Sequence, residues 1–420
     1  MSGVIIRQGW KKSTGALSRV WNHATAVAGG PTSTFSKRVG LISVVAFLGF
    51  PLSLMAFLLR PLVQVRFWPI YGDRIGHLVI ETDVFISQVQ HRDPRVVYFC
   101  FFARTPANDF YARLLKEKLK IVPTFVGEAG YVFQQTLFKR YYPLPRIDLL
   151  RTRSALTKAS KWISDDLTRA DATSLLEKLQ LERGRPYVCL WVRDSEYGAQ
   201  AMSGSNQHFA EYRNASIANY HLLCRTLDSY GFSVVRMGSI SASESPQSGL
   251  PYGDYSSSNF NSESNDFLLA KFCSFAICGD SGSVTIPLVY RKPIALANIG
   301  GFIGAIPAPN VRVLAMKRLE WIETGRPVSA SQIREFGIHK FNDSQQFSDR
   351  GVRHIENTEK QLEGVGLDML RLLKFTIHKE SEEEREIQLR FSQRVRELME
   401  EKPRFVAATR WLRDNPQFAE

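Results

Sequence analysis

From residue 62 to about residue 300, short apolar runs alternate with stretches in which apolar residues recur at helical spacing. Short apolar runs bounded by Gly, Pro, Asn or Asp are typical of buried strands. Five such runs predict strands: Leu62–Ile70, Arg95–Phe102, Tyr187–Val192, Ser233–Met237 and Ser274–Cys278. Because strands and helices alternate, the pattern favours an α/β fold with doubly wound layers.

Helical periodicity fills most of the sequence between and after these strands. The predicted helices are Leu78–Gln88, Asp109–Leu119, Gly130–Lys139, Asp165–Leu181, Ser216–Tyr230, Val284–Tyr290, Val352–Lys374 and Glu380–Met399. A further short strand is expected at Leu119–Pro123, and a Gly-containing loop is expected at Tyr71–His77. In the last helix, one buried face is predicted for Ile387, Phe391, Val395 and Leu398.

These elements divide the chain into five predicted parts. A basic arm (1–39) and a membrane-associated or re-entrant helix (40–60) come first. Two Rossmann-like domains follow, at 61–182 and 183–330, and a helical tail spans 331–420. We expect the two domains to face a cleft, because open α/β sheets bind ligands beyond the carboxyl ends of their strands.

The segment Gly40–Leu59 is apolar and about long enough to cross a bilayer core, and it is flanked by Lys37, Arg38 and Arg60. It fits a single span, a helix buried in the first domain, or an interfacial or re-entrant helix bent at Pro51. We expect the third structure, which keeps both basic flanks on the cytoplasmic side of the membrane.

Charge is distributed unevenly along the chain. There are 54 Lys and Arg residues against 41 Asp and Glu, a formal net charge of +13, yet no acidic residue precedes Asp73. A basic front beside an apolar segment favours an anionic membrane surface as partner over nucleic acid, since the aromatic residues are not interleaved with a basic stripe. The five cysteines form no CxxC pair, which suits a reducing compartment.

A small-residue loop with the sequence GDSGS follows the strand Ser274–Cys278 directly and precedes the helical stretch Val284–Tyr290. Backbone amides at a helix start, with nearby hydroxyl groups, bind phosphates. A strand-to-helix turn without a ligand also favours glycine and a capping Ser or Asp, so both interpretations stay open. The candidate diphosphate ligands are Gly279, Asp280, Ser281, Gly282 and Ser283.

Several stretches of the chain together resemble a family of bacterial glycosyltransferases associated with surface-polysaccharide gene clusters. The motifs are RIGHLVIETDVFI (74–86), YVCLWVRDSEYG (187–198), YRNASIANYHLLCRTLDSYGFSVVRMGS (212–239), the block 263–298 and WLRDNPQF near the C-terminus. The similarity covers most of the chain from about residue 62 onward, and it is carried by the order of the motifs.

More distantly, the chain is similar to the GT-B glycosyltransferases, which include heptosyltransferases and fucosyltransferases. This resemblance implies that the C-terminal domain binds the diphosphate of a nucleotide sugar and that the N-terminal domain binds the acceptor. In fucosyltransferases a similar HxR sequence carries a diphosphate-binding arginine. Here Trp191 stands in place of that histidine, two residues before Arg193, which leaves the donor open.

Three arginines are candidate ligands of the donor. Arg193 follows the strand Tyr187–Val192, where a guanidinium can clamp a diphosphate and stabilise the leaving nucleotide without a metal ion. Arg213, and Arg236 ahead of Gly238, are further candidates. Each of the three alternatively forms a surface ion pair.

Transfer to a hydroxyl group also requires a base, for which His77 is the candidate. It lies in the first strand-to-helix loop, which faces the cleft in GT-B folds, and histidine titrates near neutral pH. Glu81 lies four positions later, so the two side chains share a helix face, and Asp73, Glu81 and Asp83 are alternative bases or partners of His77. His77 alternatively makes only a structural hydrogen bond. The histidines show no metal-ligand spacing such as HExxH, and no metal or other cofactor is expected.

The sequence therefore predicts an α/β glycosyltransferase of GT-B type on the cytoplasmic side of a bacterial inner membrane. It would move a sugar from a nucleotide-diphosphate donor to a polysaccharide or lipid-linked acceptor, with inversion at the anomeric carbon and without a metal ion. Two alternatives remain: a nucleotide-sugar epimerase of the same fold, and a noncatalytic membrane-bound scaffold that binds a nucleotide sugar.

Overall fold

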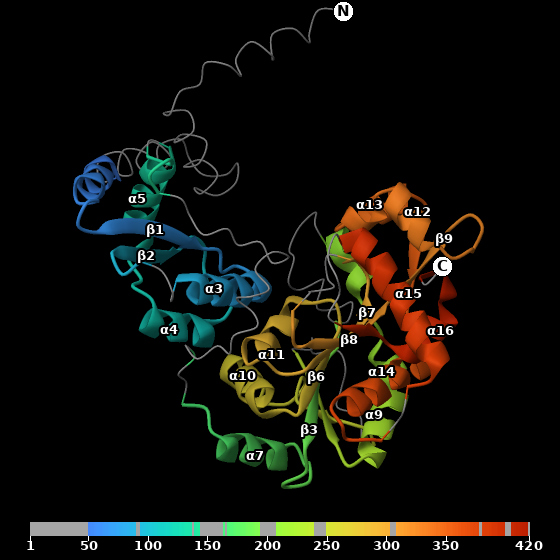
Figure 1. The fold of residues 1–420 in the computed structure, drawn as a ribbon. Helices are drawn as coiled ribbons and strands as arrows, with labels where there is room; N and C mark the ends of the chain where they lie inside the picture. The colour runs from blue at the N-terminus through green and yellow to red at the C-terminus, as the bar shows by residue number, and fades with distance from the viewer. Residues whose placement is uncertain are drawn as a thin grey trace, which may run out of the picture. The chain divides into compact units, whose positions relative to one another are not determined.

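The computed structural model divides the chain into two compact units, Met1–Ile147 and Asp148–Glu420 (Figure 1). It describes residues 49–89, 93–136, 138–142, 163, 166–193, 207–238, 249–302, 308–377, 380–399 and 405–418. The predicted basic arm, and residues 40–48 of the predicted membrane segment, lie outside this part of the chain.

The first unit is built on two parallel strands, β1 (Gln64–Ile70) and β2 (Val96–Phe102), whose residues pair in unbroken register. The helices of this unit are α3 (Ile75–Val89), α4 (Asp109–Lys118) and α5 (Thr124–Thr136). Aromatic side chains fill the interior, and the Trp68 and Phe85 rings stack with centroids 3.9 Å apart.

Two sequence predictions for this unit are wrong. The predicted strand Leu119–Pro123 is reduced to an isolated bridge between Cys100 and Ile121. The helix predicted from Gly130 begins at Thr124 instead. Two of its glycines allow α5 to approach the sheet closely. A Cβ atom at Gly127 would lie 2.3 Å from the Phe101 ring, and one at Gly130 would lie 2.3 Å from the Phe67 ring.

Helical residues 49–58 belong to the apolar segment and include Pro51. Ser53 lies on the buried face of this helix, where its hydroxyl donates to the Gly130 carbonyl of α5 over 3.3 Å. Among the described residues, none of the helices combines the length and the apolar character that a membrane crossing requires.

The second unit contains, in its described residues, a seven-stranded parallel sheet with the order β11-β8-β7-β6-β3-β4-β5. The strands are β3 (Tyr187–Trp191), β4 (Ser233–Met237), β5 (Gly253–Asp254), β6 (Phe275–Cys278), β7 (Ile294–Ile299), β8 (Val311–Met316) and β11 (Val406–Ala407). Every residue of β3, β4, β6 and β7 is buried, as expected for strands covered on both faces.

Helices cover both faces of this sheet (Figure 1). α9 (His221–Ser229) and α14 (Glu359–Leu372) lie on one face, and α10 (Glu263–Phe272) and α11 (Thr285–Val289) lie on the other. α7 (Arg169–Lys178) contacts α10. The predicted α/β class with a large parallel sheet is confirmed for this unit. The cleft between two Rossmann-like domains stays a prediction.

The predicted helix Val352–Lys374 is wrong at its start. Residues Val352–Ile355 form the strand β10, which pairs in antiparallel register with β9 (Arg318–Trp321), and α14 begins at Glu359. Arg353 pairs with Glu320 across the two strands, with 3.0 Å between Nη2 and Oε2. Two short helices, α12 (Ala330–Glu335) and α13 (Ser344–Asp349), lie between β9 and β10 in the sequence.

The C-terminal residues complete the interior of the second unit. β11 pairs with β8 at the sheet edge, and α15 (Glu382–Met399) and α16 (Thr409–Asp414) flank it in the sequence. Trp411 is fully buried, with its ring against those of Phe391 and Phe418 at centroid distances of 6.0 and 5.1 Å. Phe391 and Val395 are buried as predicted, Ile387 is only partly buried, and the Leu398 side chain lies outside the described part of the structure.

Because the Trp411 side chain is fully buried, we expect Trp411→Ala to lower the free energy of unfolding by about 3–5 kcal/mol. Leu389→Ala is the control, since that side chain of α15 is 61% exposed and should cost about 0.5 kcal/mol or less. Urea denaturation of the full chain measures both values. Equal losses for the two variants would show that the C-terminal helices contribute no core to this unit.

Candidate functional site

Four neighbouring strands of the second unit end in polar or glycine residues at the same edge of the sheet. Arg193 lies just beyond β3, Asp280 beyond β6, Gly300 beyond β7 and Lys317 beyond β8. Because the strands are parallel and adjacent in the order β8-β7-β6-β3, their carboxyl ends place these residues side by side. The carboxyl edge of an open α/β sheet is where such folds bind ligands.

Asp280 is the buried acid of this edge. Its Oδ2 accepts a hydrogen bond of 3.1 Å from the Gly300 amide, and its Oδ1 lies 3.7 Å from Nε of Arg213. Burial raises the pKa of Asp280, while Arg213, the Gly300 amide and Arg193 act in the opposite direction. The carboxylate is therefore held by neighbouring positive charge and backbone N–H groups.

Two of the three predicted donor arginines, Arg193 and Arg213, are held by contacts within the segment from Tyr212 to Ala215. Arg213 ends the 3₁₀ helix η2 (Gln207–Arg213), and its Nε donates to the Tyr212 hydroxyl over 2.9 Å. Nε of Arg193 donates to Oδ1 of Asn214 over 3.0 Å, and the Ala215 amide donates to the Arg193 carbonyl over 2.8 Å. The structure thus brings Arg193, Arg213 and Asp280 together as one group.

Lys317 belongs to the same edge and was missed by sequence analysis. Its side chain is 4% exposed and donates to the Asn214 carbonyl. Burial lowers its pKa, while Glu356 and Asp280 act in the opposite direction. Its signal in the sequence is a charged residue directly after the mostly apolar run Val311–Met316, as Arg193 directly follows the apolar run Tyr187–Val192.

Among the described residues of this group, cations outnumber carboxylates. Arg193, Arg213 and Lys317 supply three cations, and the facing carboxylates are Asp280 and Glu356. Glu356 is itself engaged by the Ser216 amide and the Asn219 side chain, at 2.9 and 3.0 Å. An anionic ligand would restore the balance of charge.

The β7 end is fixed by two contacts to Gly300. A Cβ atom there would lie 2.6 Å from both the carbonyl oxygen and Cδ2 of Tyr212, so only glycine fits without movement. The Gly300 carbonyl lies 2.8 Å from Nε2 of His354, on β10. Burial lowers the pKa of His354 to about 4, so we assign a neutral imidazole that donates its Nε2–H to this carbonyl.

Two backbone amides of the GDSGS loop already donate hydrogen bonds within the protein. The Gly279 amide donates to the Trp191 carbonyl over 2.8 Å, and the Ser281 amide donates to the Gly279 carbonyl over 2.9 Å. The Ser281 and Ser283 hydroxyls lie 2.5 Å apart, and Gly282 is exposed. The loop therefore offers two hydroxyls and an exposed glycine beside the cationic group.

Packing does not require glycine at Gly279. A Cβ atom there would lie 3.4 Å from the Trp191 carbonyl oxygen, an ordinary contact distance. The ordinary preference of strand-to-helix turns for glycine also accounts for this residue.

The described contacts of Arg236 are to other residues than those of this group. It is buried within β4, and its Nη1 lies 3.9 Å from Oδ2 of Asp254 on the neighbouring strand β5. The Tyr252 side chain also hydrogen-bonds to Arg236. These contacts are those of an internal ion pair between adjacent strands.

Asp266 is not the N-cap of α10. Ser262 is the N-cap of α10, because its hydroxyl accepts from the Asn265 amide over 3.3 Å. Asp266 lies in the first turn, where burial raises its pKa to about 7 and a hydrogen bond with Tyr255 opposes that rise.

In the first unit, the candidate base lies at the carboxyl end of β1. His77 is in the first turn of α3 rather than in the predicted loop, and its Nδ1 lies 2.5 Å from Oε1 of Glu81, one helical turn later. The hydrogen bond to Glu81 raises the pKa of His77, and burial opposes this rise. Asp73 forms an ion pair with Arg104, and Asp83 is buried.

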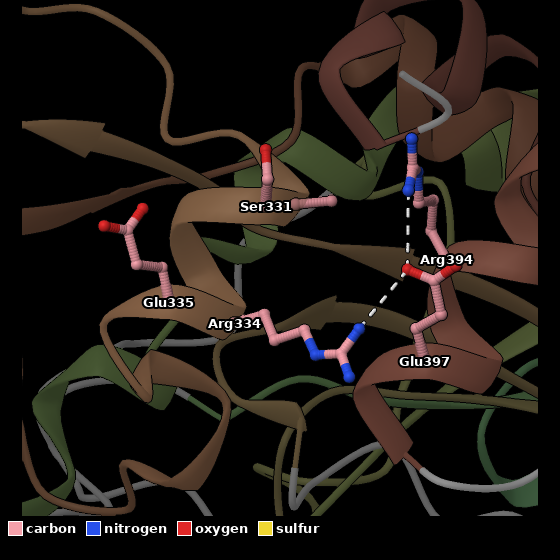
Figure 2. A pocket seen from close by; sticks show the side chains of 6 residues that line it. Ser331, Arg334, Glu335, Arg394 and Glu397 are labelled. Carbon is pink, nitrogen blue, oxygen red and sulfur yellow. Dashed lines mark hydrogen bonds and ion pairs between the residues drawn. The ribbon is translucent and has the colours of Figure 1, made fainter.

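A separate surface pocket of about 560 Å³ lies between α12 and α15 (Figure 2). Arg334 and Arg394 both point to the Glu397 carboxylate, at 3.7 and 3.4 Å, which reduces their attraction for another anion. None of the predicted site residues lines this pocket. Among the described residues, no three His, Cys, Asp or Glu side chains form a group that could hold a metal ion.

Comparison with known proteins gives only distant similarity. No family model matches the chain, and no curated protein does. A solved structure of Escherichia coli ADP-heptose lipopolysaccharide heptosyltransferase II is 12% identical, with a TM-score of 0.32, over 54% of this chain and 83% of that one.

Two structures of TibC are also similar. The iron-containing dodecameric glycosyltransferase TibC from enterotoxigenic E. coli is 14% identical, with a TM-score of 0.32, over 58% of each chain. The TibC heptosyltransferase in complex with ADP-D-β-D-heptose is 14% identical, with a TM-score of 0.28, over 57% of this chain and 60% of that one. The chain thus spans less than two thirds of either TibC chain.

The lowered pKa of His354 predicts a stability loss in acid. Between its ordinary pKa of 6.5 and its folded value of about 4, the unfolded chain takes up a proton that the folded chain does not. Stability should therefore fall as pH drops through this window, by about 3 kcal/mol from this group. Urea denaturation at a series of pH values should show a smaller loss in His354→Gln, and the same loss in both proteins would contradict the assignment.

Proposed function

We propose that this protein is a glycosyltransferase that moves a sugar from a nucleotide-diphosphate donor to a polysaccharide or lipid-linked acceptor. The observation that carries the proposal is the excess of positive charge around Asp280 at the carboxyl edge of the large sheet. The ordered motifs that resemble bacterial glycosyltransferases of surface-polysaccharide clusters support it independently.

The chemistry of transfer requires positive charge at this place. In direct displacement, a bond forms between the acceptor oxygen and the anomeric carbon while the bond from that carbon to the diphosphate breaks. The departing nucleoside diphosphate carries the bonding electrons, so negative charge grows on its phosphate oxygens. Arg193 and Arg213, held in place before the reaction, stabilise that charge.

Lys317 is assigned an indirect role in binding the diphosphate, through its contact with Asn214. Its ammonium group is buried against the Asn214 carbonyl, and Oδ1 of the same asparagine accepts from Arg193. This arrangement orients the Arg193 side chain and raises the local positive potential. The Ser281 and Ser283 hydroxyls are assigned as further donors to the phosphate.

His77 in the first unit is assigned as the base that accepts the proton of the acceptor hydroxyl group. An imidazole must be neutral to accept a proton, and the Glu81 carboxylate both orients the ring and favours its charged form. The base therefore becomes active at a higher pH than an isolated histidine would. Direct displacement of this kind inverts the configuration at the anomeric carbon, as the proposal requires.

Removal of the Arg193 guanidinium should weaken donor binding. We expect Arg193→Ala to raise the Kd for nucleoside diphosphates by about 10-fold to 150-fold, the equivalent of a charge-assisted hydrogen bond. Isothermal titration calorimetry with UDP, GDP, ADP and dTDP measures the effect. Arg312→Ala is the control, because it removes the same charge from an exposed position of β8.

If Arg193→Ala and Arg312→Ala reduce affinity equally, the effect comes from net charge and the diphosphate lies elsewhere. If no nucleoside diphosphate binds the unchanged protein, the proposed function is wrong.

Removal of the His77 imidazole should slow the chemistry and leave donor binding intact. His77→Ala is expected to lower release of nucleoside diphosphate from nucleotide sugars by about 100-fold to 10,000-fold and to abolish the acidic limb of the pH profile. Glu81→Gln should shift that limb to lower pH, because the carboxylate raises the pKa of His77. A limb that does not move in either variant would assign the base to another group, with Asp73 the next candidate.

A further inference from the structure

One face of the helix at residues 49–58 packs against the rest of the first unit. Ser53 and Ala56 are buried, and the Ser53 hydroxyl contacts the Gly130 carbonyl of α5. Gly49 lies against Phe133, because a Cβ atom there would be 2.5 Å from that ring. The Phe57 ring stacks on Phe138 with centroids 5.1 Å apart. This face holds the helix along α5.

The other face of the same helix is apolar and exposed. Phe50, Leu54 and Leu58 recur every four residues, which places them on one side of the helix, and they are 48%, 38% and 68% exposed. Met55 is 54% exposed, and Leu62, in the turn that follows, is 76% exposed. We refer to Phe50, Leu54, Met55, Leu58 and Leu62 as the apolar stripe.

Basic residues adjoin the apolar stripe. The Arg60 guanidinium lies over the Tyr141 ring at 4.9 Å, and the Tyr141 ring in turn contacts Phe57 at 5.3 Å. Lys139 and Arg140, which directly precede Tyr141, are exposed. No acidic residue precedes Asp73 in the sequence. The C-terminal end of this helix, near Leu58 and Leu62, therefore carries positive charge in the described part of the chain.

We propose that the apolar stripe and its basic neighbours Arg60, Lys139 and Arg140 dock on an anionic lipid bilayer. The stripe enters the boundary between headgroups and acyl chains, and the cations contact lipid phosphates. A second copy of the chain is the less favourable occupant, because its identical stripe would bring the same cations into opposition. The surface lies entirely in the first unit and does not depend on the donor site.

Docking on a bilayer has two components that can be separated. Burial of apolar side chains is insensitive to salt, whereas attraction between the cations and lipid phosphates is screened by it. Binding should therefore require anionic lipid, weaken at high salt, and respond separately to changes in the stripe and in its basic neighbours.

Sedimentation of the full chain with vesicles of phosphatidylcholine, with and without phosphatidylglycerol, tests the proposal. Leu58→Gln should weaken binding to the anionic vesicles by about tenfold, since one leucine no longer gains from burial. Leu389→Gln is the matched control, because Leu389 is 61% exposed on α15 of the other unit and should leave binding unchanged.

Charge is tested in the same assay. The double variant Lys139→Ala, Arg140→Ala should lose about tenfold in affinity for the anionic vesicles. The double variant Lys116→Ala, Lys118→Ala removes equal charge from exposed positions of α4 and should bind almost as well as the unchanged protein. An unchanged melting temperature confirms that each surface variant folds.

Three results would overturn the proposal. One is the absence of vesicle binding, and another is equal binding with and without phosphatidylglycerol. The third is a concentration-dependent dimer that dissociates in Leu58→Gln, which would assign the stripe to a contact between copies. Nucleoside-diphosphate affinity should be the same in all of these variants, so failure here is distinguishable from failure of the donor site.

Discussion

The buried Asp280 carboxylate is the interaction on which the carboxyl edge of the large sheet depends. It is surrounded by Arg213, Arg193 and Lys317, and it accepts the Gly300 amide from the neighbouring strand. Cations brought this close would otherwise repel each other, and a buried carboxylate without them would be costly. Each charge is therefore stable here because of the others. Among the described residues of this group the cations outnumber the carboxylates, and the proposed diphosphate would balance that charge.

This arrangement depends on backbone contacts as much as on charge. Tyr212 fits against β7 only because residue 300 is glycine, and the His354 imidazole holds the same glycine through its carbonyl. Because Tyr212 precedes Arg213 directly, these contacts also set the position of the guanidinium. Three segments far apart in the sequence thus determine one group of donors, and the antiparallel pair β9 and β10 contributes through His354.

The parts of the structure that sequence analysis predicted are those with a strong local signal. β3, β4 and β6 are buried throughout and mostly apolar because both faces of the sheet are covered, and Arg193 and Asp280 lie just beyond two strand ends. The pairing of His77 with Glu81 follows from helical spacing. Other parts depend on contacts that are distant in the sequence. The close packing of α5 depends on glycines that face β1 and β2, and residues Val352–Ile355 form a strand because they pair with β9, which is distant in the sequence. Lys317 was missed because β8 was not among the predicted strands.

A structure of the full chain with a bound nucleoside diphosphate tests the central claim most directly. The account predicts that the phosphate oxygens lie within hydrogen-bonding distance of the Arg193 and Arg213 guanidinium groups, with the Ser281 or Ser283 hydroxyl as a further donor, while Asp280 keeps its bond from the Gly300 amide. A diphosphate bound at another surface, with Arg193 and Arg213 still paired as in the free protein, would contradict it.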